Sequence, residues 1–503
     1  MIGSLPDIVA RRADLAPAAV AMEELATGRI LTYAGLDDRV GRAAALLLSR
    51  GVVPGDRVAI LCRNRIAFFE LLFACARTGA ILVPLNWRMP PAEISGLVAD
   101  SGPALVFYGA EDEATAAALA LPSIGLDEDY EALAAAARPA ANLRREWPAD
   151  GIWYLLYTSG TTGRPKGVIY TFRMALANYV NIGAAIGLIA GDTSLNFLPL
   201  FHTAGINLHT LPTLIEGGRV LIAPGFDADQ VVALLRERRL DTFFGVPTVY
   251  QALLDHPGFA AAPLGHVRHW SCGGAALPEG LAEQARRIGL RICAGMGMTE
   301  TGPTAFLAAP DDAWERPGSV GKPQLLVSAR IVDEAGRYVA DGEVGELLFG
   351  GPGITPGYWN DPEATRAAFT ADGWLRTGDL ARRDTDGFWY IAGRRKEMFV
   401  SGGENVYPAE VENVLAAHPA VTEAAVIAAP HPKWGEVGRA FIRTASGQPR
   451  PAGPELEAFC RTRLAPYKVP KSFEFVPDFP RTAAGKVQKH LLAAATPSEH
   501  AAG

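Results

Sequence analysis

Apolar residues in the first part of the chain form two alternating kinds of segment. Residues 31–50 and 68–78 carry apolar side chains at helical spacing, whereas residues 80–84 and 104–108 are short, continuous apolar runs. Continuous apolar strands between helices are typical of parallel sheets that are covered on both faces. The pattern predicts an α/β fold whose first subdomain ends near residue 150.

The same alternation resumes further along the chain and then changes. Residues 219–223 and 242–246 have the composition of buried strands, and residues 228–239 show helical spacing between them. These segments predict a second α/β subdomain. From residue 328 to 350 apolar and polar positions alternate with period two, so we expect an antiparallel β subdomain there.

The C-terminal part of the chain has another order of elements. Helices are predicted at residues 409–417 and 454–464, and strands at residues 423–428 and 472–476. This order predicts a small α+β domain. Residues 496–503 are small and polar, and we expect them to be disordered.

One segment, residues 174–191, is uncharged and long enough to raise the question of a membrane span. Asn178, Asn181 and several glycines make it a poor span. We therefore expect a helix that is buried in the protein interior.

Composition and charge narrow the class of protein. The chain has 503 residues, 49% hydrophobic and 20% charged, which is typical of a folded protein with more than one domain. A formal net charge of −7 without a basic stripe argues against nucleic acid as the main partner. Five scattered cysteines and an N-terminus without an apolar signal region indicate a reduced, cytoplasmic protein without a disulfide or metal framework.

The strongest chemical signal follows a strand predicted at residues 151–156. The next residues, 157–168, read YTSGTTGRPKGV and combine glycines, hydroxyl side chains and one lysine. Such a loop brings backbone N–H groups, hydroxyl donors and a positive charge to a phosphate. A solvated glycine turn is the alternative, and the P-loop NTPase pattern is excluded because Pro165 stands where its second glycine is required. The predicted phosphate-binding residues are Thr158, Ser159, Gly160, Thr161, Thr162, Gly163 and Lys166.

Five further motifs follow this loop in order: LPLFHTAG, GMGMTE, WLRTGD, GRRKEMFVSGGENVYPAEVE and PRTAAGKVQK. With them the whole chain resembles the adenylate-forming superfamily, which includes acyl-CoA and aryl-CoA synthetases, adenylation domains of peptide synthetases, and luciferases. Within that superfamily it is most similar to bacterial fatty acid–CoA, feruloyl-CoA and chlorobenzoate-CoA ligases.

The resemblance implies a two-step reaction. A carboxylate attacks the α-phosphate of ATP and releases pyrophosphate, and the thiol of coenzyme A then takes the acyl group from the adenylate. The implied cofactors are ATP, Mg²⁺ and coenzyme A, and the implied substrate is a small carboxylic acid with an apolar body. Whether the enzyme is a monomer or a homodimer stays open.

The resemblance also implies a division into two domains. Residues 1–393 would form a large AMP-binding domain, and residues 397–503 would form a small, mobile C-terminal domain. Residues 394–396 would form the hinge between them, with Lys396 at the hinge position. After adenylation the C-terminal domain would rotate, withdraw Lys486 from the active site and bring a glycine pair to it.

At the nucleotide the resemblance implies one role for each of five residues. Glu300 would hold Mg²⁺ and Thr299 the AMP phosphate. Asp379 would accept both ribose hydroxyls, and Arg394 would contact the ribose or a phosphate. Lys486 would bridge the carboxylate and the α-phosphate. Each assignment has an alternative without a role at the nucleotide. Thr299 and Glu300 could be a helix-capping pair, and Asp379 could be a turn residue. Arg394 and Lys486 could be solvated basic side chains.

A further group is implied around the adenine and the acid. His202 would line the acid pocket, and Met296 stands where the family usually has an aromatic residue against the adenine. Close packing of strands and a core histidine are the alternatives. The implied adenine-side residues are Gly273, Gly274, Ala275, Met296 and Gly297.

For coenzyme A the resemblance implies that Gly402 and Gly403 let the pantetheine arm pass close to the backbone. Trp434, Tyr467 and Lys471 would hold the nucleotide of coenzyme A, although core packing of Trp434 is a close alternative. Two other functions stay open: an adenylation enzyme that loads a carrier protein, and an inactive nucleotide-binding regulatory protein.

Overall fold

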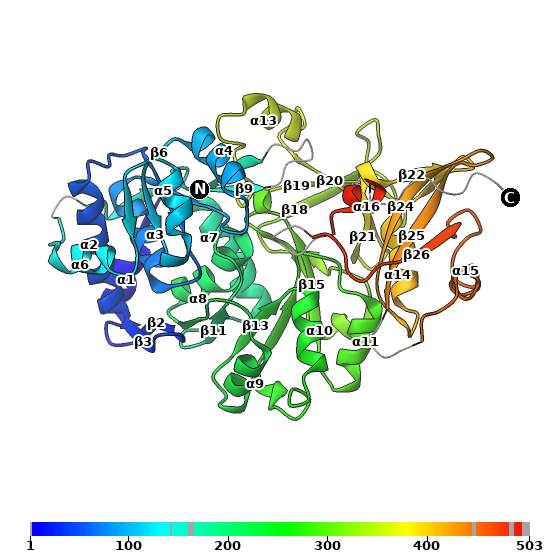
Figure 1. Cartoon of the computed structure of the whole chain (residues 1–503), viewed down its shortest axis with the longest axis horizontal. Helices are drawn as coiled ribbons and strands as arrows, with labels where there is room; N and C mark the ends of the chain where they lie inside the picture. Colours follow the sequence, from blue (N-terminus) through cyan, green and yellow to red (C-terminus); the bar gives the residue numbers. More distant parts are fainter. Residues whose placement is uncertain (1–2, 141–142, 159–164, 445–448, 482–486, 495–503) are drawn as a thin grey trace.

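The computed structural model describes residues 3–140, 143–158, 165–444, 449–481 and 487–494. Two α/β lobes lie side by side, and a separate C-terminal unit lies at the opposite end of the molecule from the first lobe (Figure 1). No helix in these ranges is both long and apolar enough to span a bilayer. The predicted α/β fold with an added antiparallel part and a small α+β domain is confirmed.

The first lobe is built on a six-stranded sheet in the order β10-β9-β5-β4-β6-β7. Its strands are parallel except for the β9–β10 hairpin. Helix α3 is buried along its whole length, which explains its continuous apolar sequence. The main elements are α2 (Tyr33–Ser49), β4 (Arg57–Leu61), α3 (Ile66–Thr78), β5 (Ile81–Pro84), α4 (Pro91–Ser101), β6 (Pro103–Tyr108), β7 (Ser123–Gly125), β9 (Ile152–Thr158) and β10 (Lys166–Thr171).

The second lobe holds a nine-stranded sheet in the order β17-β16-β15-β14-β13-β11-β12-β2-β3. Its central strands are parallel, as the second α/β pattern predicts. The elements used below are α7 (Phe172–Ile186), β11 (Thr193–Asn196), α8 (Thr210–Glu216), β12 (Arg219–Ile222), α9 (Ala228–Arg236), β13 (Thr242–Gly245), α10 (Pro247–Asp255), β14 (His269–Cys272), α11 (Glu279–Arg287), β15 (Ile292–Gly297), β16 (Thr304–Leu307) and β17 (Lys322–Pro323).

The N-terminal segment ties the two lobes together. Strands β2 (Val20–Glu24) and β3 (Arg29–Thr32) precede the first lobe in sequence but complete the edge of the second sheet, where β2 pairs with β12. The alternation of apolar segments does not predict this crossing, because it reports which residues are buried and not which sheet they join.

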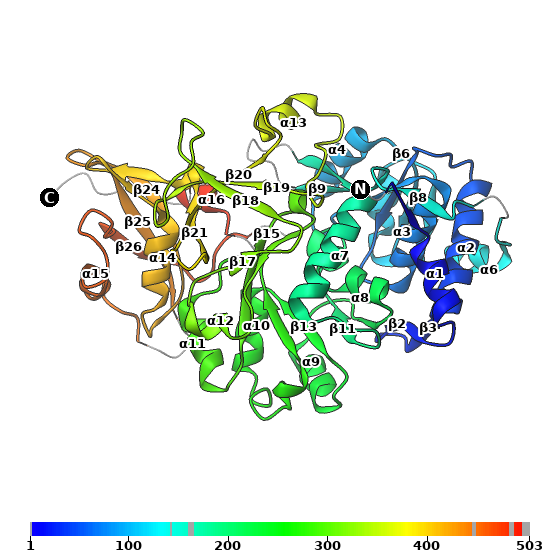
Figure 2. The same ribbon diagram turned by 180° about the vertical axis from the view of Figure 1, so that it is seen from behind.

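Helix α7 lies between the lobes together with α8 in both views (Figures 1 and 2). Asn178 on this helix is buried and donates a hydrogen bond to the carbonyl oxygen of Asn207, and Asn181 accepts one from the backbone of Leu326 at 2.8 Å. The expectation of a buried helix in this segment is therefore confirmed. Its two asparagines cross-link neighbouring segments in the interior.

The antiparallel subdomain is a four-stranded sheet in the order β18-β19-β20-β21. It is longer than the period-two pattern alone predicts, because strands β20 and β21 extend it toward the C-terminal unit. Its strands are β18 (Ser328–Val332), β19 (Gly345–Gly350), β20 (Leu375–Arg383) and β21 (Trp389–Arg394).

The C-terminal unit packs helices against a five-stranded sheet. Lys489 joins its parts, since its Nζ lies 2.8 Å from Glu397 and 2.7 Å from Glu412. Helix α14 also contacts β21 and α11 of the large part. The elements are β22 (Phe399–Ser401), β23 (Glu404–Val406), α14 (Pro408–Ala416), β24 (Val421–His431), β25 (Gly435–Thr444), α15 (Gly453–Arg461), β26 (Ser472–Phe475) and α16 (Lys489–Ala494).

Candidate active site

The predicted phosphate loop lies at the end of the β9–β10 hairpin. Thr158 and Lys166 stand opposite each other in the antiparallel register, so they mark the two sides of the loop entrance. The predicted binding residues Ser159, Gly160, Thr161, Thr162 and Gly163 lie outside the described residues, as does Lys486. The hairpin itself is held by Tyr157, whose hydroxyl donates to Asp100 at 2.7 Å.

Tyr358 connects the loop lysine to the predicted metal ligand. The Nζ atom of Lys166 lies 5.0 Å from the centre of the Tyr358 ring, and the Tyr358 hydroxyl donates to Oε1 of Glu300 at 2.9 Å. Burial, together with the adjacent Glu300 carboxylate, raises the pKa of Tyr358 well above its usual range, so the phenol keeps the proton that it donates. One aromatic ring thus holds a cation and an anion in fixed relation.

The position of Tyr358 follows from backbone pairing. Val168 and Tyr358 form an antiparallel bridge, and the backbone N–H of Trp359 donates to the carbonyl of Gly167 at 2.7 Å. The connection between β19 and β20 is thereby held beside β10 by an isolated bridge. Tyr358 was not predicted from the sequence, although the GYW sequence that follows a proline and precedes a helix cap marks a fixed aromatic turn.

Glu300 and Thr299 lie in a short turn that follows β15. The residues of this turn, Thr299 to Thr301, are buried, and the carbonyl of Glu300 accepts the backbone N–H of Thr355 at 2.8 Å. Just before the turn, a Cβ atom on Gly297 would lie 1.7 Å from the carbonyl oxygen of Pro303. Only glycine fits there, which explains the second glycine of GMGMTE by backbone packing.

The predicted ribose residues are neighbours across β20 and β21. Asp379 and Arg394 are partners in the register, and the Arg394 Nε lies 2.6 Å from Oδ1 of Asp379. Asp379 is buried, while its backbone N–H is held by the Thr377 hydroxyl at 2.9 Å. The ion pair with the arginine fixes the orientation of this buried carboxylate.

The predicted adenine and acid residues lie in different surroundings, and Gly273 is the one that lies next to Phe244 in the described contacts. Gly273 follows β14, and a Cβ atom there would lie 3.4 Å from the Phe244 ring. Gly274 adopts a φ of +83°, and it and Ala275 are exposed. Met296 is half-buried against the core of the antiparallel subdomain, and His202 is half-buried beside the Phe201 ring.

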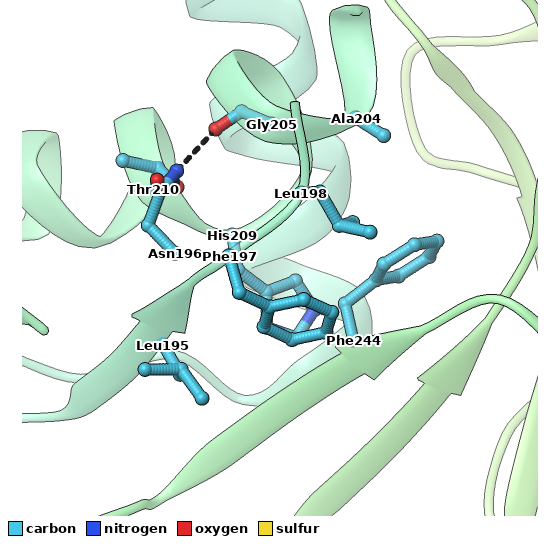
Figure 3. A pocket seen from close by; sticks show the side chains of 9 residues that line it. All are labelled: Leu195, Asn196, Phe197, Leu198, Ala204, Gly205, His209, Thr210 and Phe244. Atoms are coloured by element: carbon cyan, nitrogen blue, oxygen red, sulfur yellow. Dashed lines mark hydrogen bonds between the residues drawn. The ribbon is translucent and has the colours of Figure 1, made fainter. Parts of the chain in front are cut away.

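Phe244 also lines a small cavity (Figure 3). Its volume is about 10 Å³, and its polar lining comes from Asn196, His209 and Thr210. Asn196 is satisfied, because it donates to the Gly205 carbonyl at 2.6 Å and to Thr210 at 2.7 Å. The remaining lining residues are Leu195, Phe197, Leu198, Ala204, Gly205 and Phe244.

The glycines predicted to face coenzyme A form the β22–β23 turn. Gly402 and Gly403 have φ values of +62° and +91°, and a Cβ on Gly402 would lie 2.7 Å from the Trp434 ring. Trp434 is half exposed and not a core residue, with 39% of its surface accessible. Tyr467 packs on the C-terminal core and Lys471 is exposed, and no contact in the described part of the chain joins either to Trp434.

Comparison with known proteins decides the family. A family model described as AMP-binding enzyme matches residues 9–359, and one described as AMP-binding enzyme C-terminal domain matches residues 410–486. This chain belongs to the AMP-binding enzymes.

Relatives of this AMP-binding enzyme match it along nearly its whole length. A feruloyl-CoA synthase from an Amycolatopsis species is 42% identical over 490 residues, with 97% of each chain covered. A long-chain-fatty-acid–CoA ligase from Mycobacterium tuberculosis is 34% identical, with 96% of each covered. The solved structure of an o-succinylbenzoate coenzyme A synthetase from Bacillus subtilis in complex with ATP and magnesium ion is 32% identical, covers 97% of this chain and 100% of its own, and gives a TM-score of 0.88.

The donor set of this AMP-binding enzyme suits magnesium better than a metal that is held by protein alone. In the described ranges no cluster of three or more His, Cys, Asp or Glu side chains could enclose an ion. Magnesium keeps several waters and takes phosphate oxygens from its nucleotide, so it needs only one or two carboxylates. The single Glu300 carboxylate, fixed by Tyr358, fits such a site.

Proposed function

We propose that this AMP-binding enzyme is an AMP-forming acid–CoA ligase that uses ATP, Mg²⁺ and coenzyme A on a carboxylic acid with an apolar body. The observation that carries the proposal is the convergence of Lys166, Tyr358 and Glu300 at the mouth of the glycine loop. These groups suit a polyphosphate and its metal. The relatives named as CoA ligases, aligned from end to end, support coenzyme A as the acceptor.

In the first step a carboxylate oxygen attacks the α-phosphorus, and the bond to the bridging oxygen breaks so that pyrophosphate leaves. Lys166 faces the departing phosphates, while Asp379 with Arg394 orients the ribose. Glu300 would hold the magnesium ion, which would supply positive charge to the phosphate oxygens. Lys486 neutralises the approach of the two anions, and Thr299 contacts the phosphate that remains.

In the second step the sulfur of coenzyme A attacks the acyl carbon and AMP leaves. The glycine turn at Gly402 and Gly403 lets the pantetheine arm pass the backbone, and Trp434 offers its exposed ring to the nucleotide. We assign the hinge to residues 394–396, between the large domain and the C-terminal domain. Lys489 would make the C-terminal domain move as one body, because it ties Glu397, next to the hinge, to Glu412 on α14.

A pyrophosphate-release assay over fatty, benzoic and cinnamic acids, with and without coenzyme A, tests the activity. We expect pyrophosphate and thioester in equal amounts when coenzyme A is present. Pyrophosphate without thioester would reject the ligase and favour a carrier protein as the acceptor. No release with any acid would favour a nucleotide-binding regulatory protein.

Separate assays of the half-reactions test the rotation. We expect Lys486→Ala to abolish adenylation but to convert supplied acyl-adenylate to thioester, and Gly403→Trp to do the reverse. Equal loss of both half-reactions in both variants would refute domain alternation. The five cysteines are buried thiols without disulfides in the described structure, which suits the cytoplasmic location that we propose.

A further inference from the structure

A row of buried polar side chains crosses the second sheet near His209, which lines the small cavity and meets Ser271 of β14. Ser194, Thr242 and His269 are register partners on the neighbouring parallel strands β11, β13 and β14, so they lie on the same face. His209 and Thr213 approach from the α8 side. We call these five residues the polar floor. All five are buried.

Each residue of the polar floor carries an unpaired atom. Among the described residues, no hydrogen-bond partner meets Oγ of Ser194, Nδ1 of His209, Oγ1 of Thr213, Oγ1 of Thr242 or Nε2 of His269. Buried polar atoms are normally paired, because leaving one unpaired carries a desolvation penalty. A cluster of five in one place indicates a site that something else completes.

The polar floor is uncharged. Burial lowers the pKa of His209 to about 3 and that of His269 to about 4, so both rings are neutral near pH 7. The second ring nitrogen of each histidine meets Ser271, whose Oγ lies 3.3 Å from Nε2 of His209 and 2.9 Å from Nδ1 of His269. A second carboxylate or a sulfonate would find no counter-charge here, whereas a neutral hydroxyl would find hydrogen-bond partners.

Of the five residues of the polar floor, His209 lines the cavity. Ala204, two residues after the predicted acid-pocket residue His202, lines it as well, so the cavity lies between His209 and the segment that carries His202. Phe244, which a Cβ atom on Gly273 would meet at 3.4 Å, is also part of the lining, and the rings of Phe197 and Phe244 stand around the cavity (Figure 3). At about 10 Å³ it has room for one oxygen atom of the size of water and not for a chain.

We propose that His209 is a specificity-determining residue that binds an uncharged hydroxyl group at the end of the acid remote from its carboxylate. The acid is then a hydroxylated aromatic acid, whose ring lies against Phe244 and whose hydroxyl reaches Nδ1 of His209. A fatty acid would place a methyl group against unpaired polar atoms and gain no hydrogen bond. This inference rests on the proposed function, because it assigns the acid that the proposed ligase activates.

Binding of three acids that differ at one position tests the inference without any turnover. Isothermal titration calorimetry of the full-length protein would compare 4-hydroxycinnamic, 4-methylcinnamic and cinnamic acids. The methyl group matches the hydroxyl in size but forms no hydrogen bond. We expect the hydroxy acid to bind at least ten-fold more tightly than the other two. Equal affinities for the hydroxy and methyl acids overturn the proposal.

A variant assigns the preference to the residue. His209→Leu should reduce the ratio of hydroxy to methyl affinity to about one or below, whereas His266→Leu, a change at a half-exposed histidine that pairs with Asp241, should keep it. Thermal unfolding of both variants reports whether they fold. If His209→Leu alters only the unfolding temperature and leaves the ratio unchanged, ordered water fills the polar floor and the proposal fails.

Turnover separates this inference from the proposed function. If the hydroxy acid binds preferentially but no acid releases pyrophosphate, the ligase proposal falls and the binding site stands. If many acids release pyrophosphate at equal rates and bind equally, the ligase stands and the role of His209 falls.

Discussion

The two ends of the active site differ in how their polar groups are satisfied. At the nucleotide end Lys166, Tyr358 and Glu300 contact one another, and Asp379 pairs with Arg394. At the proposed acid end, five atoms of the polar floor have no hydrogen-bond partner among the described residues. The charged groups named at the nucleotide end pair with one another, as suits an invariant substrate such as ATP. The chain leaves the acid end to be completed by the ligand, which is where specificity is obtained.

The largest effect should come from the carboxylate at the satisfied end. Glu300→Gln keeps the shape and still accepts the Tyr358 hydrogen bond, but it removes the charge that would hold magnesium. We expect pyrophosphate release to fall by about 100-fold or more. Glu216→Gln is the matched control, since Glu216 also accepts a tyrosine hydroxyl, from Tyr179, outside the site. Equal losses in the two variants would contradict a special role for Glu300.

The burial of His209 at the proposed acid end should make the free energy of unfolding depend on pH. The folded pKa of His209 is about 3, below the ordinary value of 6.5, so its neutral form is favoured in the native state. The contribution of His209 to the free energy of unfolding is therefore complete above pH 6.5. It is lost as the pH falls toward 3, because the unfolded state binds the proton more readily than the folded state. Between pH 7 and pH 5 the loss should be about 2 kcal/mol for this group.

Urea unfolding of the wild type and of His209→Gln at both pH values measures this contribution. The variant should lose about 2 kcal/mol less stability than the wild type over the interval. Parallel pH profiles would show that His209 is not held neutral by burial.

Tyr358→Phe tests whether the phenol sets the position of Glu300. The ring stays beneath Lys166, while the hydrogen bond to the carboxylate is removed. We expect about a ten-fold loss in pyrophosphate release and a rise in the magnesium concentration needed for half-maximal rate. Tyr179→Phe removes the equivalent bond to Glu216 and should change neither value. An unchanged magnesium requirement in Tyr358→Phe would leave the phenol with a packing role alone.

Removal of a single threonine hydroxyl at each end should have the smallest effect. The comparison is between Thr377, near the nucleotide, and Thr242, in the polar floor. The Thr377 hydroxyl donates to the Leu347 carbonyl at 2.7 Å, whereas Oγ1 of Thr242 has no partner in the described structure. We expect Thr377→Val to lower the free energy of unfolding by about 1 kcal/mol or more, because it orphans a carbonyl. Thr242→Val should leave it unchanged or raise it. Chemical denaturation measures both, and similar destabilisation by the two changes would remove the contrast.

The sequence was sufficient for the features that depend on local pattern. Alternating apolar segments predicted the α/β lobes, and the YTSGTTGRPKG and GMGMTE motifs pointed to the loop lysine and to Glu300. The predicted pair Asp379 and Arg394 is joined by one ion pair. Lys166 was accessible because the composition of its loop has a direct chemical meaning. Glu300, Asp379 and Arg394, by contrast, were indicated by the resemblance of their motifs to the adenylate-forming superfamily.

The remainder depends on contacts between distant segments. Tyr358 meets Lys166 and Glu300 because the connection between β19 and β20 forms a bridge with Val168 of β10, and no single motif contains all three residues. His209 and the polar floor were missed because Thr242 was the one member in a segment assigned from the sequence, and that segment was taken as an apolar buried strand. The signal was present, since Ser194, Thr242 and His269 place polar side chains within strands that are otherwise buried.

The pairing of β2 with β12 has a consequence for biosynthesis. Strand β2 leaves the ribosome before the first lobe, yet its neighbour β12 is made only after that lobe has been translated. Contacts between such distant segments slow folding, and an unpaired strand edge invites association with other chains. The nascent chain therefore carries an open edge at β2 until β12 appears, and the newly made first lobe cannot reach its final connections before the second lobe closes the sheet.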